Sequence, residues 1–397
     1  MKGISNSYEV GKDLLGPIMT EFLENIYEFL TQYNPEDTVV FFMARGGLGI
    51  RYLLEQYLAQ RQKVVRVPFK DFYTSRLAVA KGCYRYDKDN IVEYIASQFK
   101  KATYAEMIES ICKHISMDDK WKYKNQLVTT EGLKQILLSD DEVGRLLNQY
   151  LLNQSSKFKQ YIDTLSEGKK NIIIVDTGWL ATSQHNLMRA YPNKNWIGCY
   201  FGKWDYYNVK PTYFTQVYGL GIDQNTYNKN YRRASILFYH HIIEGTLEPK
   251  IPSTEEYVHK GNTVQPNIAI PLEIMAVIDN AFFNGIHDYI QECSNMNEDK
   301  KMVERAYRKL AKMIMFPNTK QVEILKVGKR GANFGRALEV DVIQKNTIIR
   351  FYDFYKRLIN VRRAIWKQGQ MVYEFPYSYR VLQLAYFLLM YNRPIKP

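Results

Sequence analysis

The stretch "TVVFFMARGGLGIRYLLEQYL", Thr38 to Leu58, joins a strand pattern to a helix pattern through a glycine-rich loop. Its first six residues are β-branched, aromatic or apolar, and its second half carries apolar residues at helical spacing. The following "KVVRVPF", residues 63–69, predicts a further strand. Strand, helix and strand in succession are the unit of a parallel sheet, so this stretch predicts an α/β fold.

The same pattern returns later in the chain. "KKNIIIVDTGW", residues 169–179, predicts a buried strand, "TSQHNLMRAY", residues 182–191, a helix, and "NWIGCYFG", residues 195–202, another strand. An amphipathic helix is expected at residues 12–33, before the first strand. The segment between the two patterns is helical and polar in character, and the chain after residue 270 is mostly helical.

These patterns predict a Rossmann-like parallel sheet with a helical insertion. We expect the first part of the α/β domain at residues 1–89, the insertion at 90–168 and the second part of the domain at 169–265. Residues 266–397 then form a basic, mostly helical C-terminal domain.

Composition favours a folded protein. With 397 residues and 46% hydrophobic residues, the chain can bury a substantial core, which excludes disorder. No apolar run reaches the ~18 residues of a membrane span, and the N-terminal sequence lacks the layout of a signal peptide, so we expect a cytoplasmic location. The four cysteines lie far apart without a Cys-x-x-Cys pair, and we expect reduced, structural thiols.

The net charge of +13 comes from the end of the chain. Residues 301–397 hold 20 Lys/Arg against 6 Asp/Glu, whereas residues 1–300 hold 34 against 35. Such a basic segment can face nucleic acid, anionic lipid or a phosphorylated ligand, or form a solvated helical surface. Zinc-finger, helix-turn-helix and RNA-recognition signatures are absent from the sequence, so we expect no nucleic acid partner. We expect instead a peripheral contact with anionic lipid at the inner face of the membrane.

The loop after the first strand has the composition of a phosphate site. Ligands of open parallel sheets bind at the carboxyl ends of strands, where helix N-termini attract anions. Ala44, Gly46 and Gly47 would let the backbone approach a phosphate, and Arg45 would add a planar, permanently charged group. A tight strand-to-helix turn would require the same glycines for steric reasons alone.

The loop after the strand at 169–179 repeats this arrangement. Asp176 stands at the strand end, Thr177 and Gly178 form the turn, and a helix should begin near Thr182. The substrate-binding candidates of this loop are Thr177, Gly178, Ala181, Thr182, Ser183 and Gln184. Asp176 would bind sugar hydroxyls, or a Mg²⁺ that the phosphates share; the alternative is a cap or a buried hydrogen-bond partner.

Together the two loops resemble the type I phosphoribosyltransferases. "FFMARGG", "VDTGWLATSQ" and "YHHIIEGTLEP" are similar, more narrowly, to the phosphoribosyltransferase-like domain found beside haloacid-dehalogenase-type phosphatases in bacterial polysaccharide gene clusters. The resemblance covers residues 8–250. It implies transfer of 5-phosphoribose from phosphoribosyl pyrophosphate, with Mg²⁺, to a lipid-linked glycan acceptor.

The chain departs from the family pattern at two points. The usual ribose loop has two adjacent acids and a Thr-Gly pair, whereas here Thr177 follows Asp176 and the pair Thr182-Ser183 replaces Thr-Gly. A DxDx(T/V) phosphatase motif is also absent from the sequence, so the phosphatase that acts on the product is expected to be a separate protein.

The resemblance also implies residue roles. Arg45 would hold pyrophosphate beside Mg²⁺, and Asp176 would orient the ribose, contacting the metal only indirectly. Glu244 and Asp71 are candidates for a general base by residue type. Arg76 could meet a phosphate or form a surface salt bridge. His240 and His241 are expected to be structural. A candidate surface for the sugar acceptor is formed by Trp204, Tyr206 and Tyr207.

Two other functions stay open. A glycosyltransferase could use a nucleotide sugar on a similar sheet, but we do not expect its Asp-x-Asp metal motif in this chain. A non-enzymatic protein could use the basic C-terminal region to bind membrane or nucleic acid, with both loops serving only as turns.

Overall fold

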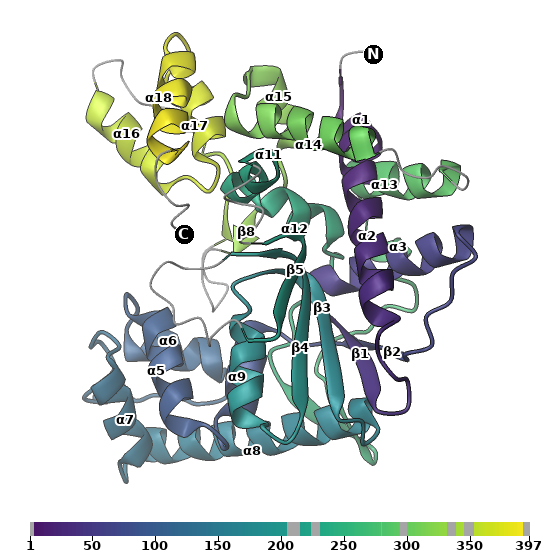
Figure 1. The fold of residues 1–397 in the computed structure, drawn as a ribbon. Helices are drawn as coiled ribbons and strands as arrows, with labels where there is room; N and C mark the ends of the chain where they lie inside the picture. The colour runs from purple at the N-terminus through teal and green to yellow at the C-terminus, as the bar shows by residue number, and fades with distance from the viewer. Residues whose placement is uncertain are drawn as a thin grey trace.

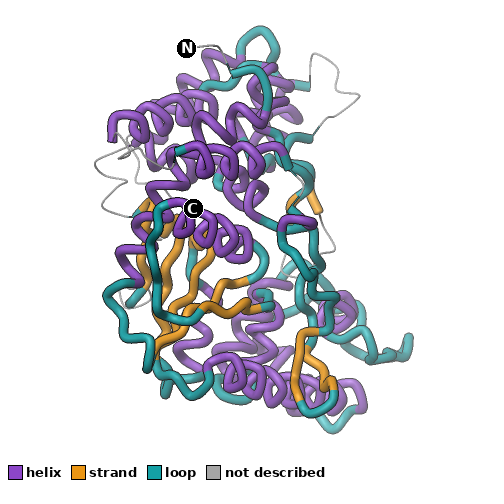
Figure 2. The backbone as a smooth tube through the Cα atoms, turned by 90° about the vertical axis from the view of Figure 1, so that its right-hand side faces the viewer, coloured by secondary structure: helices purple, strands orange, loops and turns teal. Residues whose placement is uncertain are grey.

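The computed structural model describes residues 4–204, 215–223, 231–278, 280–293, 300–331, 339–344 and 353–391. Its centre is a five-stranded parallel sheet with the strand order β2-β1-β3-β4-β5. The strands are β1 (Thr38–Met43), β2 (Phe69–Phe72), β3 (Asn171–Trp179), β4 (Asn195–Lys203) and β5 (Val217–Ile222). The α/β fold and the parallel sheet expected from the sequence are therefore confirmed (Figures 1 and 2).

Helices cover both faces of this sheet. Val40, Phe42 and Ile173 belong to the apolar core shared with α2 (Gly16–Leu30), α3 (Gly46–Gln60) and α13 (Ala281–Glu292). The alternate residues, Val39 and Phe41 among them, belong to the core shared with α4 (Arg76–Cys83), α8 (Glu142–Ser166) and α9 (Thr182–Ala190). Figure 1 shows α2 and α3 on one side of the sheet and α9 on the other. Burial on both faces explains why the strands are continuous apolar runs.

The segment between β2 and β3 is helical, as predicted. After α4 it forms α5 (Lys88–Phe99), α6 (Tyr104–Ile111), α7 (Thr130–Leu138) and α8. Thr103 caps α6 in a capping box with Glu106, and Thr129 and Asp141 cap α7 and α8. Helices α6, α7 and α8 therefore each begin at a residue whose side chain caps the first helical turn.

The strand predicted at residues 63–69 lies later in the chain. Phe69 to Phe72 pair with Val40 to Met43 of β1. The carbonyl of Pro68 accepts the Val40 N–H at 2.9 Å, but Pro68 has no N–H of its own with which to continue the ladder. Val64 is exposed, so the apolar spacing of this stretch does not mark a buried strand.

The N-terminal helix predicted at residues 12–33 is interrupted. It consists of α1 (Ser7–Val10), a π-helical turn η1 (Gly11–Leu15) and α2. Close packing accompanies the interruption, because a Cβ on Gly285 of α13 would lie 2.3 Å from the Tyr8 carbonyl oxygen. The N-terminal segment and α13 are therefore in direct backbone contact.

Beyond residue 270 the described residues are mostly helical, as predicted. The described part of the chain after β5 also contains two short antiparallel sheets. Its elements are α11 (Tyr231–Ala234), the 3-10 helix η3 (Ser235–Tyr239), α12 (His241–Leu247), β6 (Tyr257–Lys260), β7 (Thr263–Pro266), the 3-10 helix η4 (Met275–Val277), α13, α14 (Lys300–Met315), α15 (Thr319–Leu325), β8 (Arg330–Gly331), β9 (Glu339–Val340), α16 (Phe354–Arg363), α17 (Lys367–Glu374) and α18 (Tyr379–Tyr391). Trp366 is fully buried, and its ring stacks on Tyr239 at 4.4 Å. The C-terminal region thus shares a core with the helices on one face of the sheet.

The cysteines are free thiols, as expected: Cys83, Cys112 and Cys199 are buried, and Cys293 is partly buried. Among the described residues, every helix is too short or too polar to cross a bilayer.

Candidate functional site at the carboxyl edge of the sheet

The two loops singled out in the sequence meet beside each other at the carboxyl edge of the sheet. The chain leaves β1 toward β2 on one side and β3 toward β4 on the other, so the loops after β1 and β3 flank a topological switch point. A Cβ on Gly46 would lie 2.7 Å from Thr177 Cγ2 and 2.9 Å from Asp176 Oδ1. Switch points of open parallel sheets are where such folds bind ligands.

Glycine is required in the first loop because β3 packs against it. A Cβ on Gly47 would lie 2.4 Å from the Val175 carbonyl oxygen, which no side chain could occupy. The steric explanation of Gly46 and Gly47 is therefore correct, and it is also what brings the α3 N-terminus close to Asp176. Ala44, whose N–H donates to the Phe72 carbonyl at 2.9 Å, joins Arg45 through a cis peptide bond.

Arg45 and Glu248 form an ion pair at this edge. Arg45 precedes α3 as its N-cap residue, and its Nη2 lies 3.1 Å from Glu248 Oε2. The arginine side chain is 37% exposed and the glutamate 17%. The guanidinium is thus held by a carboxylate while still reaching solvent, where an anionic ligand could meet it.

Asp176 lies partly buried among other acids, and its pKa is raised to about 7. Loss of hydration is the main cause, and the negative charges of Glu248 and Glu244 add to it. Backbone N–H groups of Thr177 and Gly47 donate to the carboxylate and oppose this shift. The carboxyl group is therefore poised to change its protonation near neutral pH, a property common at functional sites.

Left-handed backbone conformations shape the second loop. Gly178 has φ +95°, Trp179 +83° and Ala181 +51°. A Cβ on Gly178 would lie 2.5 Å from the Gly202 carbonyl oxygen, so this position has both a steric and a conformational need for glycine.

Helices α3 and α9 both start at this edge without a cap from their N-cap side chains. Arg45 precedes α3 and Ala181 precedes α9, and neither side chain bonds the first helical turn. At α4, by contrast, Ser75 accepts from the Ala78 N–H. Thr182 and Ser183, both partly exposed, occupy the first turn of α9. At α3 the Gly47 N–H donates instead to the Asp176 carboxylate. The N-termini of both helices lie at the edge where anion binding was predicted.

Gln184 does not belong to this site. It is fully buried, and its Nε2 donates to the carbonyls of Trp196 and Gln216 at 3.1 Å each, while its Oε1 accepts from the Tyr200 hydroxyl at 3.1 Å. Its amide joins α9 to β4 and to the residue before β5, so the interpretation of Gln184 as a substrate ligand does not fit the structure. A buried amide among neighbouring strands leaves no periodic signal in the sequence.

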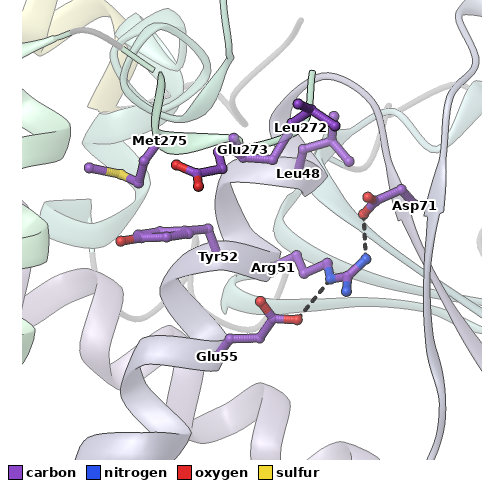
Figure 3. A pocket seen from close by; sticks show the side chains of 9 residues that line it. Leu48, Arg51, Tyr52, Glu55, Asp71, Leu272, Glu273 and Met275 are labelled. Atoms are coloured by element: carbon purple, nitrogen blue, oxygen red, sulfur yellow. Dashed lines mark hydrogen bonds and ion pairs between the residues drawn. The ribbon is translucent and has the colours of Figure 1, made fainter. Parts of the chain in front are cut away.

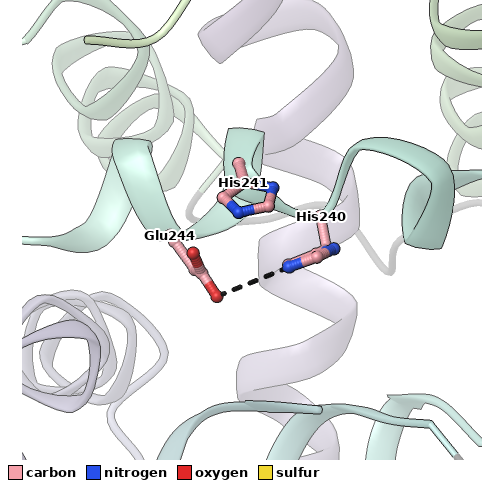
Figure 4. Close-up of side chains that lie close together, drawn as sticks. All are labelled: His240, His241 and Glu244. Atoms are coloured by element: carbon pink, nitrogen blue, oxygen red, sulfur yellow. Dashed lines mark ion pairs between the residues drawn. The ribbon is translucent and has the colours of Figure 1, made fainter. Parts of the chain in front are cut away.

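Glu244 is held in place by Trp179 and lies beside two histidines. The Trp179 indole donates to Glu244 Oε1 at 2.8 Å, and His240 Nε2 lies 3.9 Å from the same oxygen. Ligand-type atoms of His240, His241 and Glu244 all lie within 4.8 Å of one another (Figure 4). Two imidazoles and a carboxylate suit a transition metal better than Mg²⁺, which prefers oxygen ligands.

Asp71 lines a different pocket, beside α3. It pairs with Arg51 at 2.8 Å, and Arg51 also bonds Glu55 at 2.9 Å (Figure 3). The pocket has a volume of about 370 Å³, and Tyr52 and Met275 line it as well. Asp71 is thus engaged by an arginine within this pocket and is not brought to Asp176.

The other predicted residues are placed as follows. Arg76 is exposed at the first position of α4, which follows β2. The backbone N–H of Trp204 donates to the Trp179 carbonyl at 2.7 Å, and the indole ring of Trp204 lies 6.0 Å from the ring of His240. Tyr206 and Tyr207 lie outside the described residues.

Sequence reasoning missed Glu248 and Arg51. Glu248 follows α12, whose last residue packs on α3: a Cβ on Gly49 would lie 2.2 Å from the Leu247 carbonyl oxygen. Glu248 was present in the quoted "YHHIIEGTLEP", but only the fold places it beside Arg45.

The fold and this edge define a Rossmann-like α/β protein with a candidate anion site at its switch point. No protein-family model matches the chain, and no curated protein matches it.

Proposed function

We propose that the protein is a glycan phosphoribosyltransferase. It would transfer 5-phosphoribose from phosphoribosyl pyrophosphate to a hydroxyl of a lipid-linked bacterial polysaccharide and release pyrophosphate. The observation that carries this proposal is the meeting of the loops after β1 and β3, which puts Arg45, Asp176 and the N-termini of α3 and α9 at one edge. A donor with phosphate at both ends of a ribose needs two anion sites with polar groups between them.

Each group at the edge has a role in this reaction. Arg45 and the first turn of α3 would bind pyrophosphate and stabilise the charge that grows on it as the C1–O bond breaks. Asp176 would bind the ribose hydroxyls and favour the positive, oxocarbenium-like ring. Thr182, Ser183 and the N–H groups of α9 would bind the 5-phosphate. The acceptor hydroxyl then attacks C1 and loses its proton, for which Glu244 is the candidate base.

The residues at the edge fit a Mg²⁺ ion. Asp176 and Glu248 offer hard oxygen ligands. Burial is the main cause of the raised pKa of Asp176, and a divalent cation would offset the smaller contribution from the negative charges of Glu248 and Glu244. Mg²⁺ bound there would neutralise charge on the pyrophosphate. A separate phosphatase would then remove the 5-phosphate from the product.

A nucleotide-sugar glycosyltransferase is the second candidate. Contrary to our expectation, Asp87-Lys88-Asp89 does have the Asp-x-Asp spacing that such enzymes use for a metal. Asp87, however, makes two bonds to Arg189, at 2.5 and 3.0 Å, and Asp89 lies 3.6 Å from Lys134. Both carboxylates are thus paired with cations, which favours the phosphoribosyl donor.

Titration calorimetry tests the choice of donor. We expect phosphoribosyl pyrophosphate to bind in the presence of Mg²⁺, and a nucleotide sugar not to bind. Asp176→Asn should keep most of this affinity, since both phosphate sites remain, but should lower pyrophosphate release in the presence of acceptor about a hundredfold or more, which corresponds to ~3 kcal/mol of transition-state stabilisation. Binding of a nucleotide sugar, or normal turnover in a folded Asp176→Asn variant, would refute the proposal.

A further inference from the structure

Helix α18 turns an apolar face to solvent. Val381, Leu384, Leu388 and Leu389 are between 52% and 70% exposed, and Ala385 is exposed beside them. Their spacing of i, i+3, i+4, i+7 and i+8 places all five on one side of the helix. Single exposed leucines are ordinary on protein surfaces, but a continuous apolar helix face marks an interaction site.

Helix α16 extends this apolar surface. Phe354, Tyr355 and Leu358 are exposed at spacings that put them on one helix face, and the exposed Tyr377 precedes α18. Both helices pack on α17: the Phe354 ring lies 5.5 Å from that of Phe375, and Leu382 of α18 packs on the same small core. Figure 1 shows α16, α17 and α18 together at one corner of the molecule. We name their exposed residues the α16–α18 surface.

The charges around this surface are positive. Lys356, Arg362, Arg363 and Arg380 are exposed on α16 and α18. Between residues 353 and 391 the sequence contains only two acids, Asp353 and Glu374. Asp353 lies 3.5 Å from Lys356, and Glu374 is buried, where it accepts from Asn360 and Gln370. An approaching partner therefore meets apolar side chains flanked by arginine and lysine.

We propose that the α16–α18 surface docks on an anionic lipid bilayer. An apolar helix face flanked by basic side chains has the chemistry of helices that lie in the plane of a membrane, with the apolar face among the acyl chains and the cations at the headgroups. With 13 residues, α18 falls short of the ~20 that a spanning helix needs, so it would lie along the interface. A second copy of the chain fits less well, because it would bring the same basic residues face to face.

Flotation with lipid vesicles tests this surface independently of any catalytic activity. The full chain should float with vesicles of phosphatidylcholine and phosphatidylglycerol at low salt, and much less with phosphatidylcholine alone. The double variant Leu384→Asp/Leu388→Asp should lose flotation, and Arg362→Gln/Arg363→Gln should weaken it roughly 30-fold. Leu138→Asp is the matched control, because Leu138 is 75% exposed on α7; it should float like the unmodified chain.

Three results would overturn the proposal: a full chain that stays at the bottom with anionic vesicles, flotation that survives both leucine substitutions, or a dimer in sedimentation that these substitutions dissociate. The leucines are exposed, so the variants should melt as the unmodified chain does, which keeps loss of binding separate from loss of folding. Failure here would leave the proposed transferase untouched, since donor binding is measured without lipid.

Discussion

Asp176 retains its proton to a higher pH than an ordinary aspartate, because burial and the charges of Glu248 and Glu244 raise its pKa to about 7. In the unfolded chain the same carboxyl ionises near pH 4. Between these values the unfolded state gives up its proton first, so the free energy of unfolding falls as pH rises from about 4 to 7, by at most about 4 kcal/mol. Below pH 4 and above pH 7, Asp176 adds no further pH dependence.

The variant Asp176→Asn should abolish this dependence. Without added metal and with a chelator present, we expect the variant to match the unmodified chain below pH 4, where Asp176 is protonated in both the folded and unfolded states, and to melt at a higher temperature at pH 8. Thermal melts across this range measure the difference. Parallel curves for the two proteins would show that Asp176 ionises normally in the folded state.

Gly46 permits the contact between the two loops, and Gly46→Ala should break it. The added Cβ would lie 2.7 Å from Thr177 Cγ2 and 2.9 Å from Asp176 Oδ1, so one loop must move away. We expect a stability loss of about 1–3 kcal/mol and at least tenfold weaker binding of phosphoribosyl pyrophosphate. Gly328→Ala is the control, since no atom lies within 4 Å of its added Cβ. Equal effects of both variants on binding would contradict a role for the loop contact.

At the scale of the element, a negative charge added at the start of α9 should raise the stability of the protein but weaken its binding of phosphoribosyl pyrophosphate. Ser183 lies in the first turn, where an acid interacts favourably with the helix dipole. Ser183→Glu should therefore stabilise the protein by about 0.3–1 kcal/mol while lowering affinity for phosphoribosyl pyrophosphate tenfold or more, because the carboxylate repels the 5-phosphate. Chemical denaturation and calorimetry measure the two effects.

Ser183→Ala separates charge from the hydroxyl in that experiment. It removes one hydrogen-bonding group without adding charge, so its affinity loss should be much smaller than that of Ser183→Glu. If Ser183→Glu binds the donor as tightly as the unmodified chain, the α9 N-terminus is not a phosphate site.

At the scale of the whole molecule, Arg233 ties together three segments far apart in the sequence. From α11 it bonds Glu21 of α2 at 2.7 and 2.9 Å and Glu304 of α14 at 2.7 and 3.0 Å, and it lies 4.4 Å from the Tyr307 ring centroid. Its side chain is only 18% exposed. Removing Arg233 would leave the carboxylates of Glu21, 24% exposed, and Glu304, 40% exposed, without its positive charge between them.

We expect Arg233→Met to lower the free energy of unfolding by about 2–4 kcal/mol, measured by chemical denaturation. Lys159→Met is the matched control: Lys159 pairs with Asp163 within α8, and both side chains are nearly half exposed. Its loss should stay below about 0.5 kcal/mol. Similar losses for both variants would mean that the Arg233 network does not hold α2 and α14 together.

The sequence by itself predicted those strands and helices whose pattern of apolar residues is complete within the element. The strands "TVVFFM" and "NIIIVDTGW" were predictable because a strand buried on both faces is a continuous apolar run. The helices between residues 90 and 168 were predictable because their signals are local. Capping residues such as Thr103 and Asp141, and apolar residues at helical spacing, lie within a few positions of one another in the sequence. Arg45 and Asp176 were predictable as neighbours, because the carboxyl ends of parallel strands share one edge of the sheet.

Tertiary structure decided the features that depend on contacts between distant segments. The start of β2 follows from pairing with β1 and from the missing N–H of Pro68, and the hydrogen bonds of Gln184 follow from the position of β4. The Arg45–Glu248 pair and the Trp179–Glu244 bond join residues about 200 and 65 positions apart. The spacing of residues along a chain fixes which face of an element is apolar, but which elements face each other is fixed only when the whole core packs.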